Sequence, residues 1–179
     1  MATLSVGGTT VFDGSATQGL TSATTFPNGH ILQCQVASKT SKSTTTATSP
    51  TSTGLTVSIT PSNATNKIFV QALVGSVGHS GQLNRTFISI SGGTSQSVGD
   101  DITGHDVGAC WCPRSDDAGW SQGSLACAFL DAPASTSAQT YTLNYWQSTS
   151  GTGVINSAYH NDANVGNAIT TLTAWEVVQ

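Results

Sequence analysis

Charged side chains are scarce in this chain. They make up 8% of its 179 residues, against about a quarter of an ordinary soluble domain. The five basic residues never form a run, and the formal net charge is -4; they are Lys39, Lys42, Lys67, Arg85 and Arg114. Binding to a phosphate backbone needs clustered Lys and Arg. The composition therefore argues against nucleic acid as a partner.

Long hydrophobic runs are also missing. No stretch approaches the roughly 18 consecutive apolar residues that a membrane-spanning helix requires. The first residues, MATLSVGGTTVFDG, lack the basic region and apolar core of a secretory signal. We therefore expect no membrane insertion, and release from a producing cell by lysis.

Good helix formers are rare, because Glu occurs only at Glu176 and Met only at Met1. Segments of alternating apolar and polar residues recur instead, separated by turn-forming residues. These segments are residues 31–36, 54–60, 67–74, 85–90, 124–130, 140–146 and 168–178. The pattern predicts an all-β fold, an antiparallel β-sandwich of the jelly-roll kind, over residues 30–179.

Two polar segments fit this scheme less well. Residues 1–29 are rich in Gly, Ser and Thr and indicate an extended N-terminal arm. Residues 39–53 are rich in Thr, which is typical either of a disordered linker or of a polar edge strand. Neither segment carries enough apolar surface to offset its own ordering entropy. We expect neighbouring subunits to supply the missing contacts.

The four cysteines fall into two pairs. Cys34 and Cys127 lie in apolar alternation, so we expect them to be small core residues. Cys110 and Cys112 are two apart on one predicted strand, where a disulfide between them would be strained. Free thiols and a disulfide between subunits both remain open.

No nucleophile with a base beside it stands out in the sequence. The match to G-x-S-x-G at residues 119–123 is followed by a predicted strand, not by the helix that a nucleophile elbow opens, and His30, His79, His105 and His160 lie far apart. We expect neither an enzyme nor a cofactor.

Residues 99–120 hold the densest polar cluster. Five of the nine acidic residues lie there with one histidine and two tryptophans: Asp100, Asp101, His105, Asp106, Trp111, Asp116, Asp117 and Trp120. The carboxylates could bind calcium, but their spacing lacks the terminal Glu of an EF-hand, and a solvated loop without metal is the simpler interpretation. Exposed aromatic rings beside carboxylates also suit sugars, since rings stack on pyranose faces.

Other aromatic residues bear on the same alternatives. Trp146 and Tyr159 flank later loops and would extend such a surface, with core packing as the alternative. Trp175, in the last strand, is assigned to the core.

Four blocks of the sequence look familiar as patterns of strands and turns. They read TTFPNGHILQCQ, TGLTVSITPSNATNKIFVQALVGS, CAFLDAPASTSAQTYTLNYW and ITTLTAWEVVQ. Together, over about residues 24–179, they resemble small tail-fibre and virion structural proteins of tailed bacteriophages, especially those that infect cyanobacteria and other aquatic bacteria. The resemblance implies a trimeric β-sandwich that is assembled in the host cytoplasm and resides in the virion.

The resulting hypothesis is a non-enzymatic trimeric tail fibre. Residues 1–29 would attach it to other phage structural proteins of the tail, baseplate or capsid, with the apolar side chains of Val6, Val11, Phe12, Leu20 and Phe26 as contacts. The 99–120 cluster would touch the host surface, a glycan in the first instance. One alternative is a capsid decoration protein whose arm clamps the phage head, and another is a free carbohydrate-binding module.

Overall fold

The computed structural model describes residues 3–6, 9–13, 26–79, 84–97, 110–111, 121–149, 151–157 and 168–179. Every strand pairing in these residues is antiparallel, and none of the described residues is helical. The predicted all-β sandwich is confirmed. No described segment forms a helix that is long and apolar enough to cross a membrane.

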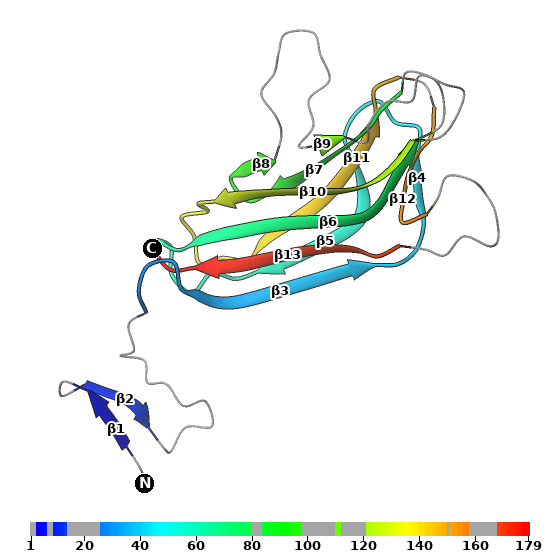
Figure 1. Ribbon diagram of the computed structural model, residues 1–179. Helices are drawn as coiled ribbons and strands as arrows, with labels where there is room; N and C mark the ends of the chain where they lie inside the picture. The colour runs from blue at the N-terminus through cyan, green and yellow to red at the C-terminus, as the bar shows by residue number, and fades with distance from the viewer. Residues whose placement is uncertain are drawn as a thin grey trace.

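The first large sheet, which we call the outer sheet, has six strands in the described part of the chain. They are β3 (Ile31–Lys39), β13 (Thr170–Val177), β6 (Lys67–His79), β12 (Gly153–Ile155), β4 (Ser43–Thr45) and β10 (Ser121–Asp131). β6 is the central strand, because β13 and β12 pair with it in succession along its length and β10 pairs with it as well. Figure 1 shows β10, β6, β13 and β3 one below another.

The second large sheet has five strands in the same described residues. They are β5 (Thr51–Ile59), β11 (Gln139–Gln147), β7 (Thr86–Gly92), β8 (Ser95–Ser97) and β9 (Cys110–Trp111). A separate two-stranded sheet pairs β1 (Thr3–Val6) with β2 (Thr9–Asp13). In Figure 1 this hairpin lies apart from the two large sheets.

The core lies between the two large sheets and follows from the period of two along each strand. In β5 the alternate residues Leu55, Val57 and Ile59 are buried, while the residues between them are exposed. Tyr141 and Leu143 of β11 are completely buried beside them in one continuous apolar cluster. Each fully buried Leu or Ile of this cluster contributes about 1.5–3 kcal/mol to stability.

The Thr-rich segment 39–53 finds its partners within its own subunit, contrary to our expectation. Thr44 of β4 is paired with Val154 of β12, and Thr45 is buried. Tyr145 of β11 donates its hydroxyl proton to the Thr44 carbonyl at 2.7 Å. β-branched threonine suits such a strand, and hydrogen bonds to β12 and β11 replace the contacts with another subunit that we had predicted.

Two core assignments were wrong. Cys34 is exposed, whereas Cys127 is buried as predicted. Trp175 lies half-buried on the opposite face of β13 from the buried residues Leu172 and Ala174. For Trp146 we left a surface role and core packing open, and it is buried and stacks on Phe87, with ring centroids 5.5 Å apart.

Candidate functional surfaces

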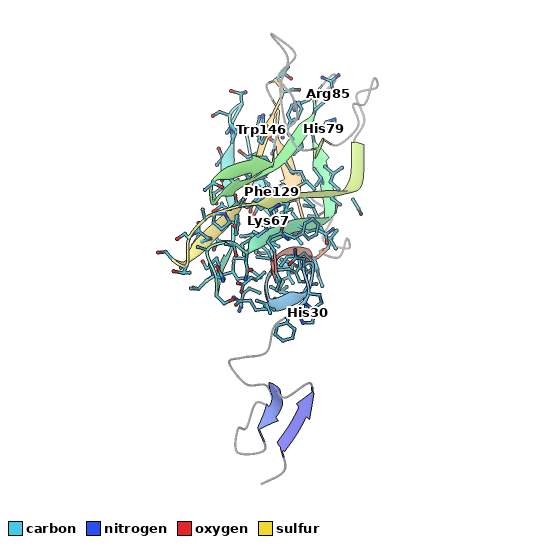
Figure 2. All side chains as sticks on the ribbon, turned by 90° about the vertical axis from the view of Figure 1, so that its left-hand side faces the viewer. His30, Lys67, His79, Arg85, Phe129 and Trp146 are labelled. Atoms are coloured by element: carbon cyan, nitrogen blue, oxygen red, sulfur yellow. The ribbon has the colours of Figure 1, made fainter. Side chains whose placement is uncertain are left out.

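The two ends of the sandwich differ in what they carry. Figure 2 shows His30 at the end where the chain enters from the N-terminal segment, and His79, Arg85 and Trp146 at the opposite end. At the entry end, the ring of Phe26 stacks on His30 with centroids 4.3 Å apart. We refer to these as the entry end and the far end.

The far end is held by buried polar side chains. Asn84 donates from Nδ2 to Oε1 of Gln147 at 2.7 Å, and Gln147 donates from Nε2 to Oγ1 of Thr86 at 2.8 Å. The Thr86 hydroxyl in turn donates a hydrogen bond to the carbonyl of Gly78 at 2.9 Å. Because all three side chains are buried, these bonds satisfy groups that water cannot reach, and they tie β6 to β7 and β11.

His79 lies at the end of β6 and is completely buried. Neither of its ring nitrogens has a hydrogen-bond partner among the described residues. Burial, reinforced by the positive charge of Arg85, lowers the pKa of His79 below its ordinary value. The imidazole is therefore neutral near pH 7.

Two buried carboxylates, Asp131 and Glu176, accept hydrogen bonds from other parts of the chain. Asp131 accepts the Tyr141 hydroxyl at 2.8 Å and the Thr94 hydroxyl at 2.6 Å. Glu176 accepts four hydrogen bonds, from the Ser62 amide, the Ser62 hydroxyl, Asn66 Nδ2 and Gln33 Nε2, at 2.6–2.7 Å. These contacts join distant parts of the chain and leave little capacity for a substrate at either carboxylate.

Most of the predicted receptor residues lie outside the described part of the chain. These are Asp100, Asp101, His105, Asp106, Asp116, Asp117 and Trp120. Trp111 is placed as a backbone position on β9, opposite Phe87 of β7. No group of His, Cys, Asp and Glu within the described residues could hold a metal ion, and the Asp-rich segment lies outside those residues.

Some described residues next to the predicted receptor segment, 99–120, are placed. Ser97 of β8 pairs opposite Ile90 of β7. Trp111 pairs opposite Phe87, and Phe87 stacks on Trp146 at the far end. Ser121, the first residue of β10, pairs opposite His79, which also lies at the far end.

Four of the five predicted attachment residues lie in the described part of the chain, and one lies outside it. Val6 lies on β1, and Val11 and Phe12 lie on β2, while Leu20 is outside the described residues. Phe26 is half-buried against His30 at the entry end.

Sequence reasoning missed one feature, an apolar surface on the outer sheet. Five large hydrophobic side chains in the described residues are exposed, and all five belong to its strands or directly precede one; they are Ile31, Val36, Leu73, Leu130 and Ile169. A signal was present in β6, where KIFVQALV places apolar residues on both faces, a pattern typical of strands covered on both sides.

Comparison with known proteins identifies no relative: no family model and no curated protein matches this chain.

Proposed function

We propose that this chain is a non-enzymatic structural protein of a bacteriophage virion, a trimeric tail fibre. Its N-terminal arm attaches it to the particle, and its far end contacts a glycan on the host surface. The observation that carries the proposal is the separation of the two ends. Trp111 and Ser121, the described residues on either side of 112–120, lie at the far end, near Trp146 and His79, whereas Phe26 and His30 lie at the entry end.

The hairpin supports a distinct attachment unit. β1 and β2 form a sheet of their own, and the pairings of the described strands do not join it to either large sheet. A small unit outside the sandwich is free to dock on another protein without disturbing the core. The sequence blocks that resemble phage virion proteins favour the same interpretation.

The hydrogen-bonded carboxylates favour a structural role. Glu176 and Asp131 are completely buried, and protein donors occupy their oxygens. A general acid or base must instead reach its substrate within about 3 Å or through one water. These two groups therefore stabilise the fold and are unsuited to catalysis.

A capsid decoration protein is the second candidate, and the same hairpin favours it, because a separate unit can equally clamp neighbouring capsid subunits. The two candidates differ in the far end. A fibre needs a receptor surface there, and a decoration protein does not.

Binding to cells separates them. Fluorescently labelled full chain is added to a panel of aquatic bacteria that includes cyanobacteria, since the resemblance points to their phages. We expect saturable binding to at least one member, its loss in the Trp111→Ala/Trp120→Ala double variant, and its retention when residues 1–25 are deleted. Thr56→Ala/Thr60→Ala, which truncates two exposed side chains near one edge of the second sheet, is the matched control and binds as the parent does.

Absence of binding to every cell type would contradict the fibre. Binding of the full chain to purified phage heads, lost on deletion of residues 1–25, would then establish decoration. Binding to neither cells nor phage particles would contradict both virion functions.

A further inference from the structure

The apolar surface of the outer sheet is continuous across four strands. Residues paired between neighbouring strands point to the same face, so the registers define its rows. From β3 through β13 and β6 to β10 these rows are Cys34, Trp175, Phe69 and Leu130; then Val36, Thr173, Gln71 and Ala128; then Ser38, Thr171, Leu73 and Ala126. We call this surface, together with Ile31 and Ile169, the outer face.

Two aromatic rings lie near one end of the outer face. The rings of Phe69 and Trp175 are 5.5 Å apart between centroids and tilted by 31°. Both are half-buried within the subunit, and Val36 beside them is 61% exposed. Aromatic side chains in an apolar setting are the usual anchors of protein–protein interfaces.

The outer face carries almost no charge. Lys67, which pairs opposite Val177 at the end of the face, is the one charged residue on the outward side of these registers. Lys39, Glu176 and Asp131 occupy positions on the other side of the sheet, where both carboxylates are completely buried. A charged partner would find no counter-charge in the three rows.

The second sheet carries exposed polar residues along its edge strand β5 and serves as a comparison for the outer face. Along β5 the exposed positions include Thr56 and Ser58, and the Ser58 and Thr140 hydroxyls hydrogen-bond across the strands at 2.7 Å. Among the side chains that the structure describes, the exposed large hydrophobic ones are therefore confined to the outer sheet and the residue that precedes β13, and they are not a general consequence of composition.

We infer that the outer face is the interface between copies of this chain, packed sheet against sheet. The three rows of a second copy carry the same aliphatic, aromatic, Ser, Thr and Gln side chains and no charge, so contact between copies along these rows creates no like-charge repulsion and buries no unpaired charge. The inference deepens the proposed function and rests on it for the number of copies, which is three in a trimeric fibre, where the three outer faces meet around the three-fold axis and each contacts both of its neighbours.

The size of the outer face fits this occupant. Four strands about 4.8 Å apart and about nine residues long cover roughly 550 Å². Three such faces that meet around one axis bury roughly 1,650 Å² in total, which is the size of a specific interface. Apolar patches of a few hundred Å² on a protein surface are often functional, and larger ones mark interaction sites.

The first test uses the unmodified surface. Light scattering of the full chain at micromolar concentration is expected to give three times its mass of 18.2 kDa. In that oligomer Cys34, exposed on the isolated subunit, is treated with N-ethylmaleimide and quantified by peptide mass spectrometry. We expect it to react more slowly, by about tenfold or more, than a cysteine introduced by Thr56→Cys on the second sheet, because reactivity requires exposure.

The second test changes the face. Val36→Lys/Leu73→Lys places two charges on exposed positions and leaves the core intact, and we expect a folded monomer with the circular dichroism spectrum of the parent. Thr56→Lys/Ser58→Lys makes the same charge change on the second sheet and is expected to remain an oligomer. If the first double variant does not fold, the Cys34 rate in the parent decides.

The outcomes separate this inference from the proposed function. An oligomer in which Cys34 reacts as fast as the introduced cysteine, or which survives Val36→Lys/Leu73→Lys, overturns the interface and leaves the trimeric fibre standing. A protected Cys34 in a protein that binds neither cells nor phage particles upholds the interface and overturns the virion function. A monomer overturns both the interface and the trimeric fibre.

Discussion

Replacement of Glu176 by Gln tests the most densely hydrogen-bonded buried charge in the described structure. Oε1 accepts from the Ser62 amide, the Ser62 hydroxyl and Asn66 Nδ2, each at 2.7 Å, and Oε2 accepts from Gln33 Nε2 at 2.6 Å. In the variant the amide oxygen can take the place of Oε1, and its NH₂ group then faces the NH₂ group of Gln33. Gln33 cannot flip freely, because Nε2 also donates to the Thr60 carbonyl at 2.7 Å.

The cost follows from these contacts. Loss of the Gln33 bond, which is assisted by the charge, costs about 1.5–3 kcal/mol. The three remaining bonds weaken when their acceptor becomes neutral, but a charge no longer has to be buried, and these two effects oppose each other. We expect Glu176→Gln to lower the free energy of unfolding at pH 7 by about 2–3 kcal/mol.

The effect depends on pH in a definite direction. Burial of Glu176 raises its pKa, but hydrogen bonds from Asn66, Ser62 and Gln33 outweigh burial, so the pKa lies below its ordinary value of 4.5. A carboxyl group with a lowered native pKa stabilises the fold above its unfolded pKa, and the contribution is lost as the pH falls through the native pKa. The difference in free energy of unfolding between the parent and Glu176→Gln therefore becomes smaller from pH 7 to pH 3.

Urea unfolding followed by tryptophan fluorescence measures both quantities, at one protein concentration because the stability of an oligomer depends on it. Gln35→Ala, which removes an exposed amide from β3, is the control and should change stability by less than about 0.5 kcal/mol. A loss of less than about 0.5 kcal/mol for Glu176→Gln at pH 7, or a loss of equal size at pH 3, would refute the reasoning.

Two further substitutions probe the outer sheet. Burial, and to a smaller extent the charge of Arg85, lowers the pKa of His79, so the folded protein loses stability as the pH falls below about 6.5, the pKa of an unfolded histidine. The parent should therefore lose free energy of unfolding between pH 7.5 and pH 5.5, and His79→Leu should reduce that loss by about 1 kcal/mol in urea titrations. A loss of the same size in the variant would contradict this. Gly75→Ala brings a Cβ within 2.5 Å of the Ile169 carbonyl oxygen, whereas a Cβ at Gly123 meets nothing within 4 Å. We expect Gly75→Ala to cost about 1–3 kcal/mol in the same assay and Gly123→Ala to be close to neutral, and equal costs would contradict the close approach at Gly75.

The seven main strands could be predicted from the sequence because alternation is a local signal. Leu55, Val57 and Ile59 alternate with polar residues, so a single strand already specifies which face is inside. The structure confirms that face. The short pair β4 and β12 could not be found in this way, because a three-residue strand is defined by a distant partner, as Thr44 is by Val154.

Our prediction of which apolar residues face the core failed where both faces of a strand are apolar. In β13 the sequence offers Trp175 on one face and Leu172 with Ala174 on the other, and we had assigned Trp175 to the core. The structure places the smaller residues inside, because they face the densely packed cluster shared with the second sheet. Nothing local in the sequence specifies that choice, since it depends on the volume left by other strands. The candidate receptor residues are a separate case. Most of them lie outside the described part of the chain, and their role stays a prediction.

The two large sheets carry different sequence patterns, and the difference bears on how the protein is assembled. β5 alternates cleanly, as expected of a strand with one face on the core and one in water. β6 is apolar on both faces over Ile68, Phe69, Val70 and Leu73, as expected of a strand covered on both sides. In the described residues one of those sides is covered by the second sheet, and the other still exposes Leu73 and its neighbours. Since the sequence has only 8% charged residues with which to keep such a face in solution, a covering layer from outside the subunit accounts for a pattern that folding of one chain leaves unexplained.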